Sequence, residues 1–175
     1  MNYLFLDNGF EEIEAITTID LLRRANIPLT TVSITGKPMV LGAHNIAVEA
    51  DGLFENVDFD DAEMLILPGG QTNLDKHNGL CELLIHHNDE NKEIAAICAA
   101  PSVLGKLGVL AGKQATCYPG FESWLGESYV GGLVVESKNI ITAKGPGLAA
   151  DFAFCIIEHI KGSDVADQVY DIAQY

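Results

Sequence analysis

Basic residues are scarce in this sequence. Only 10 Lys and Arg stand against 25 Asp and Glu among 175 residues, which gives a net charge of −15. A surface that follows nucleic-acid phosphates needs clustered Lys and Arg, and adhesion to an anionic membrane has the same requirement. The composition therefore argues against nucleic acid and membrane surfaces as partners.

Long apolar runs, export signals and cofactor fingerprints are missing as well. The longest uncharged apolar run, residues 94–100, is far shorter than the ~20 residues of a membrane-spanning helix. The N-terminal residues lack a basic region and meet Asp7 early, unlike a secretory signal. The four cysteines form no C-x-x-C pair, so we expect reduced thiols and a cytoplasmic location. No G-x-G-x-x-G motif supports NAD binding, and the scattered histidines predict no metal site.

The chain length predicts one domain, residues 1–175. Strand-length apolar segments alternate with helix-length amphipathic ones. Strands are predicted at 3–6, 29–33, 64–67, 94–97 and 115–117, with a hairpin over 133–142 and an irregular or hairpin segment over 38–49. Helices are predicted at 11–24, 80–87, 101–107, 149–160 and 165–172. In the first helix, Ile13, Ile16, Ile19 and Leu22 recur at a spacing of three and are expected to form one face.

This alternation predicts a parallel sheet with helices on both faces. We therefore expect a flavodoxin-like, doubly wound α/β fold with a small antiparallel addition. Ligands of such sheets bind at the carboxyl ends of the strands. Five loops are predicted at that edge: 7–9, 68–70, 98–101, 118–120 and 144–147.

Cys98 is the strongest candidate for chemistry. It stands between a predicted strand and a helix that begins near Pro101, with the small residues Ala96 and Ala100 on either side, as in a nucleophile elbow. The N–H groups at a helix start lower the pKa of a thiol and can bind an oxyanion. The alternative is an inert core thiol, and the local sequence leaves both interpretations open.

Other groups at this edge are ambiguous. Glu11, Glu12 and Glu14 open the first predicted helix. Their ordinary interpretation is solvated charge that matches the helix dipole, and the alternative is a carboxyl beside the thiol that acts as general acid or base. Gly69 and Gly70 allow the backbone to approach a ligand closely, or form a simple turn.

Four strings carry a resemblance over nearly the whole chain: GFEEIE at 9–14, LPGG at 67–70, AAICAAP at 95–101 and GPG at 145–147. Together they resemble the ThiJ/PfpI superfamily, in particular the branch of the human parkinsonism-associated deglycase and its bacterial ThiJ-like relatives. The resemblance implies a flavodoxin-like sandwich that forms a homodimer and needs no cofactor.

The resemblance also implies roles for individual residues. Cys98 would be the reactive, easily oxidised cysteine, and Glu14 the carboxyl that hydrogen-bonds its sulfur. Gly70 and Ala99 would supply the oxyanion-binding N–H groups. Arg24 matches a position near the dimer contact that reaches toward the partner's site.

Two positions depart from the family pattern. Protease-like members carry a His directly after the nucleophile, where this chain has Ala99, so peptidase activity is not expected. Human-like members carry a His before the Pro of the fourth loop, where this chain has Tyr118. The Tyr118 hydroxyl could still hydrogen-bond a substrate oxygen.

The implied function is that of a glyoxalase or deglycase that uses Cys98 on small carbonyl substrates, namely 2-oxoaldehydes such as methylglyoxal or their adducts. The alternative is an oxidative-stress sensor or chaperone-like protective protein with an oxidisable Cys98. Weaker alternatives are an amidase or peptidase-like hydrolase, for which no His is placed to activate the thiol, and thiazole monophosphate synthesis, which an old family name suggests and no residue supports. The first two readings share every residue, so the sequence does not separate them.

Overall fold

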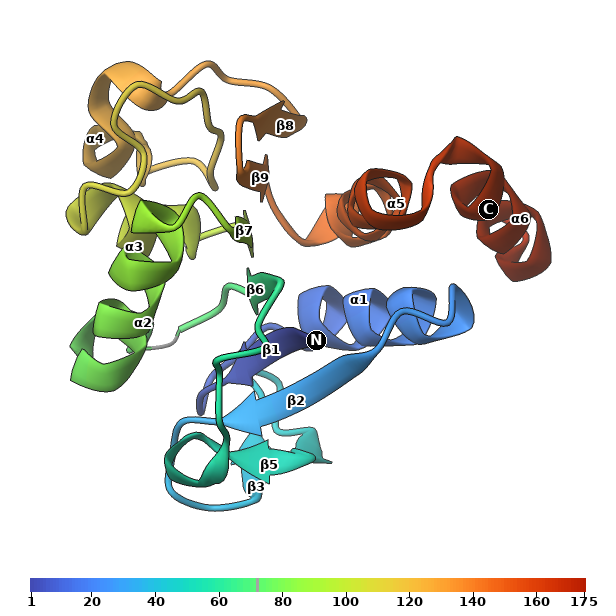
Figure 1. Ribbon diagram of the computed structural model, residues 1–175, viewed down its shortest axis with the longest axis horizontal. Coiled ribbons are helices and arrows are strands. Elements are labelled where there is room, and N and C mark those ends of the chain that lie inside the picture. Colours follow the sequence, from blue (N-terminus) through green and yellow to red (C-terminus); the bar gives the residue numbers. More distant parts are fainter. Residues whose placement is uncertain (72) are drawn as a thin grey trace.

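The fold is built on a seven-stranded sheet with the strand order β5-β2-β1-β6-β7-β9-β8 (Figure 1). The computed structural model describes residues 1–71 and 73–175. The strands are β1 (Asn2–Leu6), β2 (Leu29–Ser33), β5 (Gly52–Leu53), β6 (Met64–Leu67), β7 (Glu93–Ile97), β8 (Val134–Ser137) and β9 (Ile140–Ala143). All neighbours pair in parallel except β8, which runs antiparallel to β9 at one edge.

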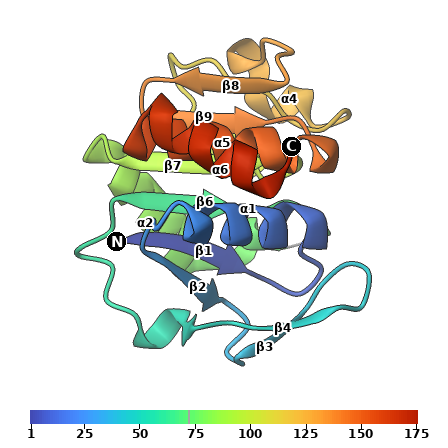
Figure 2. The same ribbon diagram turned by 90° about the vertical axis from the view of Figure 1, so that its right-hand side faces the viewer.

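Helices cover both faces of this sheet (Figures 1 and 2). One layer contains α1 (Glu12–Arg24), α5 (Ala149–Lys161) and α6 (Ser163–Ala173), and the other contains α2 (Asn78–Asp89), α3 (Pro101–Lys106) and α4 (Glu122–Leu125). Alternate strand residues supply the two cores: Leu4 and Leu6 pack in the α1–α5 layer, and Tyr3 and Phe5 in the other. Burial on both faces explains why the inner strands are continuously apolar, and the predicted doubly wound α/β architecture is confirmed.

The small antiparallel addition is also present. β3 (Met39–Leu41) and β4 (Ala47–Glu49) form a separate two-stranded sheet within the segment 38–49. A second antiparallel pair, β8 with β9, turns at Lys138, which adopts a left-handed backbone with φ 56°.

The strand predicted at 115–117 is wrong. Ala115 makes only an isolated parallel bridge to Tyr129. Both edges of β9 are already paired, with β7 on one side and β8 on the other, so the segment has no place in the sheet there. Its polar groups turn instead to side chains and loops: the Thr116 N–H donates to the Thr142 hydroxyl at 3.0 Å, and the Thr116 hydroxyl donates to the Gly132 carbonyl at 2.6 Å.

The predicted buried face of α1 is partly wrong. Ile19 and Leu22 are buried, but Ile13 and Ile16 are 56% and 41% exposed. The face that packs on the core includes Ala15 and Thr18 with Ile19 and Leu22, which is the i, i+3, i+4, i+7 stripe of a helix. Small side chains on this stripe let α1 lie close to α5, its main helical neighbour.

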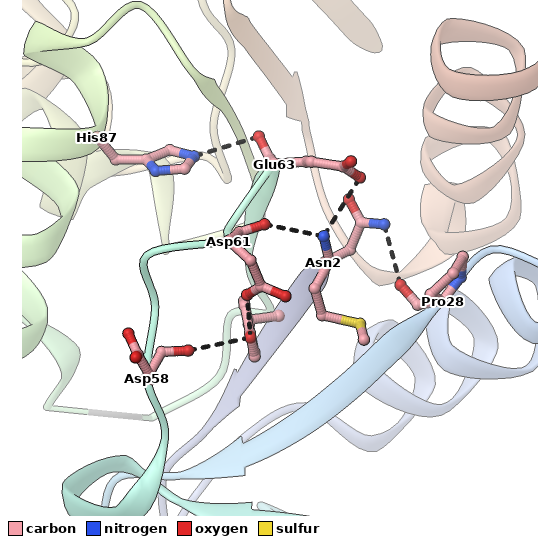
Figure 3. Close-up of polar contacts among 8 residues, drawn as sticks. Asn2, Pro28, Asp58, Asp61, Glu63 and His87 are labelled. Atoms are coloured by element: carbon pink, nitrogen blue, oxygen red, sulfur yellow. Dashed lines mark hydrogen bonds and ion pairs between the residues drawn. The ribbon is translucent and has the colours of Figure 1, made fainter.

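The N-terminal ends of the strands are held by polar contacts (Figure 3). The Met1 ammonium donates to the Asp61 carbonyl at 2.9 Å, and the Asn2 side chain donates to the Pro28 carbonyl at 2.9 Å. The buried His87 ring bonds the Glu63 carbonyl at 3.3 Å. The first two contacts tie the start of β1 to the segments that precede β6 and β2, and the third ties α2 to the segment that precedes β6.

The carboxyl ends of the strands bring the five predicted loops together. The Glu11 N–H donates to the Gly69 carbonyl at 3.0 Å, the Cys98 N–H to the Ala143 carbonyl at 2.9 Å, and the Tyr118 N–H to the Cys98 carbonyl at 2.8 Å. This edge is therefore the place to look for a site. Within the residues that the structure describes, none of the helices has both the length and the apolar character needed to cross a membrane.

Candidate functional site

Cys98 occupies a strained turn between β7 and α3. Its φ is +66°, a left-handed value that side-chain-bearing residues seldom adopt. Two backbone hydrogen bonds hold this conformation, from the Cys98 N–H to Ala143 and from the Tyr118 N–H to the Cys98 carbonyl. The small neighbours Ala96 and Ala100 are buried, and Cys98 itself is only 8% exposed. The elbow thus presents the sulfur in an enclosed space.

Glu14 reaches the same space from α1. Its side chain is fully buried, and Oε2 accepts a hydrogen bond of 2.7 Å from the Gly69 N–H. The other oxygen, Oε1, is buried without a hydrogen-bond partner among the described residues, although the carboxyl interacts directly with the Cys98 thiol. Burial of a carboxyl oxygen that accepts no hydrogen bond costs free energy. This cost is avoided if the oxygen carries a proton that points at the Cys98 sulfur.

Gly69 makes room for this pair. A Cβ atom at position 69 would lie 2.7 Å from Cβ of Cys98 and 2.9 Å from Oε2 of Glu14. Any larger residue would therefore push the thiol and the carboxyl apart. The Gly-Gly pair after β6 left open a close approach to a ligand or a simple turn, and the groups that Gly69 approaches are this carboxyl–thiol pair.

The two groups change each other's titration. Burial raises the pKa of Glu14 to about 7, against opposing hydrogen bonds from Cys98 and from the Gly69 N–H. Burial also raises the pKa of the Cys98 thiol well above its usual range, and the Glu14 charge adds to this, while the N–H groups of Ala99 and Gly70 oppose it. The expectation that the Cys98 thiol has a lowered pKa is therefore wrong when Glu14 is ionised. α3 has only six residues, so its dipole is too short to offset burial beside a carboxylate.

Backbone N–H groups of Ala99 and Gly70 face the Cys98 sulfur and favour its charged form. Gly70 has a φ of +109°, and a Cβ atom there would lie 2.2 Å from the Gly9 carbonyl oxygen. Only glycine fits this bend. Two preorganised N–H donors beside a nucleophile can stabilise an oxyanion on the carbon that the sulfur attacks.

Tyr118 lies beside the Cys98 turn. Its N–H bonds the Cys98 carbonyl, its ring lies against Gly145, and its side chain is 45% exposed. Tyr118 lines a largely apolar hollow of about 360 Å³ with Pro146, Leu148 and their loop neighbours. The fourth and fifth predicted loops therefore line this hollow together, next to the Cys98 turn.

Arg24 does not join this group within one chain. It lies at the last turn of α1, ten residues after Glu14, or about 15 Å along a helix axis. Its guanidinium pairs with Asp20 at 2.6 Å on the exposed surface. Any role for Arg24 near a site would involve another molecule.

Glu12 is a buried structural side chain, and its interpretation as solvated charge is wrong. It is 6% exposed, and it accepts hydrogen bonds from the N–H and Nδ1 of His44 at 2.7 and 2.8 Å and from the Ile46 N–H at 3.4 Å. Burial raises its pKa, but these bonds outweigh burial and lower it overall. Glu12 therefore holds the loop between β3 and β4 against the start of α1. No sequence pattern distinguished it from the neighbouring acids.

Glu11, Glu12 and His44 also place three metal-ligand atoms within 4.8 Å of one another. The Glu12 carboxylate is already the hydrogen-bond acceptor of the loop, however, and the His44 ring makes an ion-pair contact of 2.8 Å with it. The donor set is therefore in use as a structural clamp.

Comparison with known proteins matches this chain to a family. The model of the DJ-1/PfpI family matches residues 3–159. The chain is 36% identical to Protein dj-1beta of Drosophila melanogaster over 95% of this chain and 92% of that protein. It is 32% identical to the glutathione-independent glyoxalase DJR-1.2 of Caenorhabditis elegans over 88% of this chain and 84% of that protein. The structure of oxidized DJ-1 from Toxoplasma gondii superposes with a TM-score of 0.95 at 31% identity, covering 99% of this chain and 97% of that one. By its sequence and its fold, this chain belongs to the DJ-1/PfpI family, in the DJ-1 branch.

Proposed function

We propose that this protein is a cysteine-dependent enzyme that converts 2-oxoaldehydes such as methylglyoxal, free or as adducts, into 2-hydroxy acids without a cofactor. One observation carries the proposal: the fully buried Glu14 carboxyl and the Cys98 side chain pack together around Gly69, and burial there raises the pKa of Glu14 to about 7. A carboxyl with that pKa can both give and take a proton at neutral pH. The name of the C. elegans relative, a glutathione-independent glyoxalase, supports the same reading.

The reaction begins with a shared proton. Because both pKa values are raised, the pair resists a second negative charge and holds one proton near neutral pH. In the reactive form the proton is on Glu14 and the sulfur is the thiolate. The sulfur attacks the aldehyde carbon, and the new oxyanion takes the proton of Glu14 to give a hemithioacetal, which leaves Glu14 as the carboxylate. The N–H groups of Gly70 and Ala99 stabilise the oxyanion.

Glu14 then moves a proton between the two substrate carbons. It removes the hydrogen from the former aldehyde carbon as a proton and returns it to the neighbouring ketone carbon, while the hydroxyl proton of the hemithioacetal passes to the former ketone oxygen, which leaves a thioester of lactate on Cys98. Water cleaves the thioester and regenerates the thiol. The sum is methylglyoxal plus water to lactate, in which one carbon is oxidised and its neighbour reduced, so no external redox partner is needed. In an adduct, the amine or thiol is released in addition. The Tyr118 hydroxyl would hydrogen-bond the ketone oxygen.

The test compares wild type with Cys98→Ala and with Cys81→Ala, a half-buried cysteine of α2. Purified wild type and Cys81→Ala should form lactate from methylglyoxal, and Cys98→Ala should form none above the uncatalysed rate. A wild-type protein without turnover, or an active Cys98→Ala variant, would overturn the proposal.

The second candidate function is an oxidative sensor or protective protein. The Gly70 and Ala99 N–H groups favour a negative sulfur, and a protonated Glu14 beside them would also hold a sulfinate, the oxidised form that carries two oxygens on sulfur. Brief peroxide treatment followed by mass spectrometry should then modify Cys98 before Cys81 or Cys155. Fast oxidation of Cys98 with no turnover of 2-oxoaldehydes would favour this function over the enzyme.

We also propose that the protein works as a homodimer in the cytoplasm. The four cysteines are all unpaired, which suits a reducing compartment. Large apolar side chains are exposed on neighbouring parts of α1 and the β3–β4 hairpin: Ile13, Ile16, Met39, Leu41 and Ile46. Several exposed large apolar side chains on two adjoining elements are typical of a protein interface. Arg24, on the same helix, would lie near the contact.

A further inference from the structure

A second cavity adjoins the Cys98 site on the side of α3. It has a volume of about 250 Å³, and its lining includes Gly70 and Ala99, the residues whose N–H groups face the sulfur. Lys106 and Asp75 bring opposite charges to the same cavity, while Val103 and Phe121 provide apolar surface. The proposed reaction uses none of these last four residues.

Lys106 and Asp75 form a partly buried ion pair. Nζ of Lys106 lies 2.7 Å from Oδ2 of Asp75, and the two side chains are 31% and 28% exposed. The same ammonium lies 4.7 Å from the centre of the Trp124 ring, a distance typical of cation–π contact. The pair joins the short turn Leu74–Lys76 to the last residue of α3.

The pair presents both signs of charge to one ligand. An ammonium has three N–H donors and a carboxylate has two oxygens, so a single mutual bond leaves each group able to bind a further partner. A simple anion would be attracted by Lys106 but repelled by Asp75. A simple cation would be attracted by Asp75 but repelled by Lys106. A zwitterion satisfies both, with its carboxylate on Lys106 and its ammonium on Asp75.

The size and the apolar wall of the cavity restrict which zwitterions can bind there. A volume of about 250 Å³ corresponds to roughly eight water molecules, which suits a small aliphatic amino acid such as valine. Its side chain would pack on Val103 and Phe121. We propose that this cavity is a binding site for a free α-amino acid, held through its ammonium and carboxylate by Asp75 and Lys106.

The experiment measures binding to the full chain by titration calorimetry or by NMR line shifts, and it needs no catalysis. L-valine is compared with N-acetylvaline, which lacks the ammonium, and with valinamide, which lacks the carboxylate. The variants are Lys106→Met and Asp75→Asn. Lys92→Met is the matched control, because Lys92 forms a similar 2.8 Å ion pair with Glu90 but does not line this cavity.

We expect wild type and Lys92→Met to bind L-valine alike. Each one-sided probe should bind wild type at least tenfold more weakly than L-valine, and each cavity variant should lose at least tenfold in affinity for L-valine. Melting temperatures of the variants check that they are folded. Equal binding of L-valine and N-acetylvaline, unchanged affinity in both variants, or no binding of L-valine at tens of millimolar would overturn the proposal.

Discussion

The Glu14 carboxyl and the Cys98 thiol share one enclosed space, and they titrate as a unit. Both pKa values are raised: the Glu14 charge adds to the shift of Cys98, whereas the hydrogen bond with Cys98 opposes the shift of Glu14. Two such groups lose their protons in two steps that belong to the pair rather than to either residue. Below the first step both groups are protonated, and above it the pair carries one negative charge. The reactive form, a Cys98 thiolate beside a protonated Glu14, exists only above the first step, where the pair carries one negative charge.

Turnover should therefore rise with pH. Below the Glu14 pKa of about 7, the fully protonated pair lacks a nucleophile, and above it the singly charged pair is formed. We expect kcat/KM for methylglyoxal to increase through about pH 7 and then level off. The rate of alkylation of Cys98 by iodoacetamide should follow the same curve. A rate that falls through this range would contradict the shared-proton mechanism.

Replacing Glu14 by Gln separates donation of a hydrogen bond from proton transfer. The amide still bonds the sulfur but cannot carry a proton between carbons. Glu14→Gln should therefore keep a reactive thiol while turnover falls by a factor of ~10² or more, the usual scale of general acid–base catalysis. The rise near pH 7 should disappear with it. Glu11→Gln is the control, since it changes the neighbouring acid, and it should leave turnover near that of wild type. Wild-type turnover in Glu14→Gln would show that Glu14 is not the proton carrier.

At the scale of elements, the start of α1 is fastened to the β3–β4 hairpin by one side chain. Glu12 is buried and accepts three hydrogen bonds from His44 and Ile46. The hydrogen bond to Glu12 raises the pKa of His44 and so favours its charged form. The clamp sets the position of the hairpin next to the helix that carries Glu14.

Glu12→Gln should loosen this junction. The amide keeps its shape but loses the charge that strengthens these bonds, so unfolding free energy should fall by about 1–3 kcal/mol. Urea denaturation measures the loss, and hydrogen exchange should increase first at residues 42–46. Glu49→Gln, an exposed acid of β4, is the matched control. Equal stability of the two variants would mean that the clamp contributes nothing.

The sequence predicted the elements well and the faces less well. Apolar runs and turn residues predicted nearly every strand of the sheet and nearly every helix that covers it, because backbone preferences and burial act locally. The strand expected at 115–117 failed because β8 already occupies the free edge of β9, which is decided by a distant segment. Ile13 and Ile16 match a helical spacing but lie outward, because the small residues of α1 suit close packing better.

Some features of the candidate site could likewise be predicted from the sequence, and others could not. The elbow at Cys98 could be predicted from small residues around a strand-to-helix turn. The choice of Glu14 over Glu12 needed the resemblance to a family, since both are buried acids on one turn and differ only in what they face. The raised thiol pKa could not be predicted, because it depends on burial and on a carboxylate 84 positions earlier in the chain.

For the whole molecule, the outward isoleucines of α1 are the main support for a dimer. Sedimentation at micromolar concentration should give about twice the chain mass of 18.8 kDa. Ile16→Asp places a charge in the proposed contact and should yield a monomer, because a buried unpaired carboxylate is strongly disfavoured. Ile85→Asp is the control: Ile85 is exposed to a similar extent, 39% against 41%, but lies on α2 in the other layer. A monomeric wild type would exclude the dimer.

The sheet divides the apolar interior into two packing clusters, one under α1 and α5 and one under α2 and α3. A consequence is that the two halves of the core should be energetically independent. Ile156 belongs to the first cluster and Ile94 to the second, and both are fully buried. Removal of one methylene from either, as Ile156→Val or Ile94→Val, should cost about 0.5–1.5 kcal/mol. In a double-mutant cycle the two losses of unfolding free energy should add to within roughly 0.5 kcal/mol. Substitutions in one layer could then change the stability of the protein without changing the contribution of the other layer. A larger coupling energy would show that the strands transmit packing changes from one layer to the other.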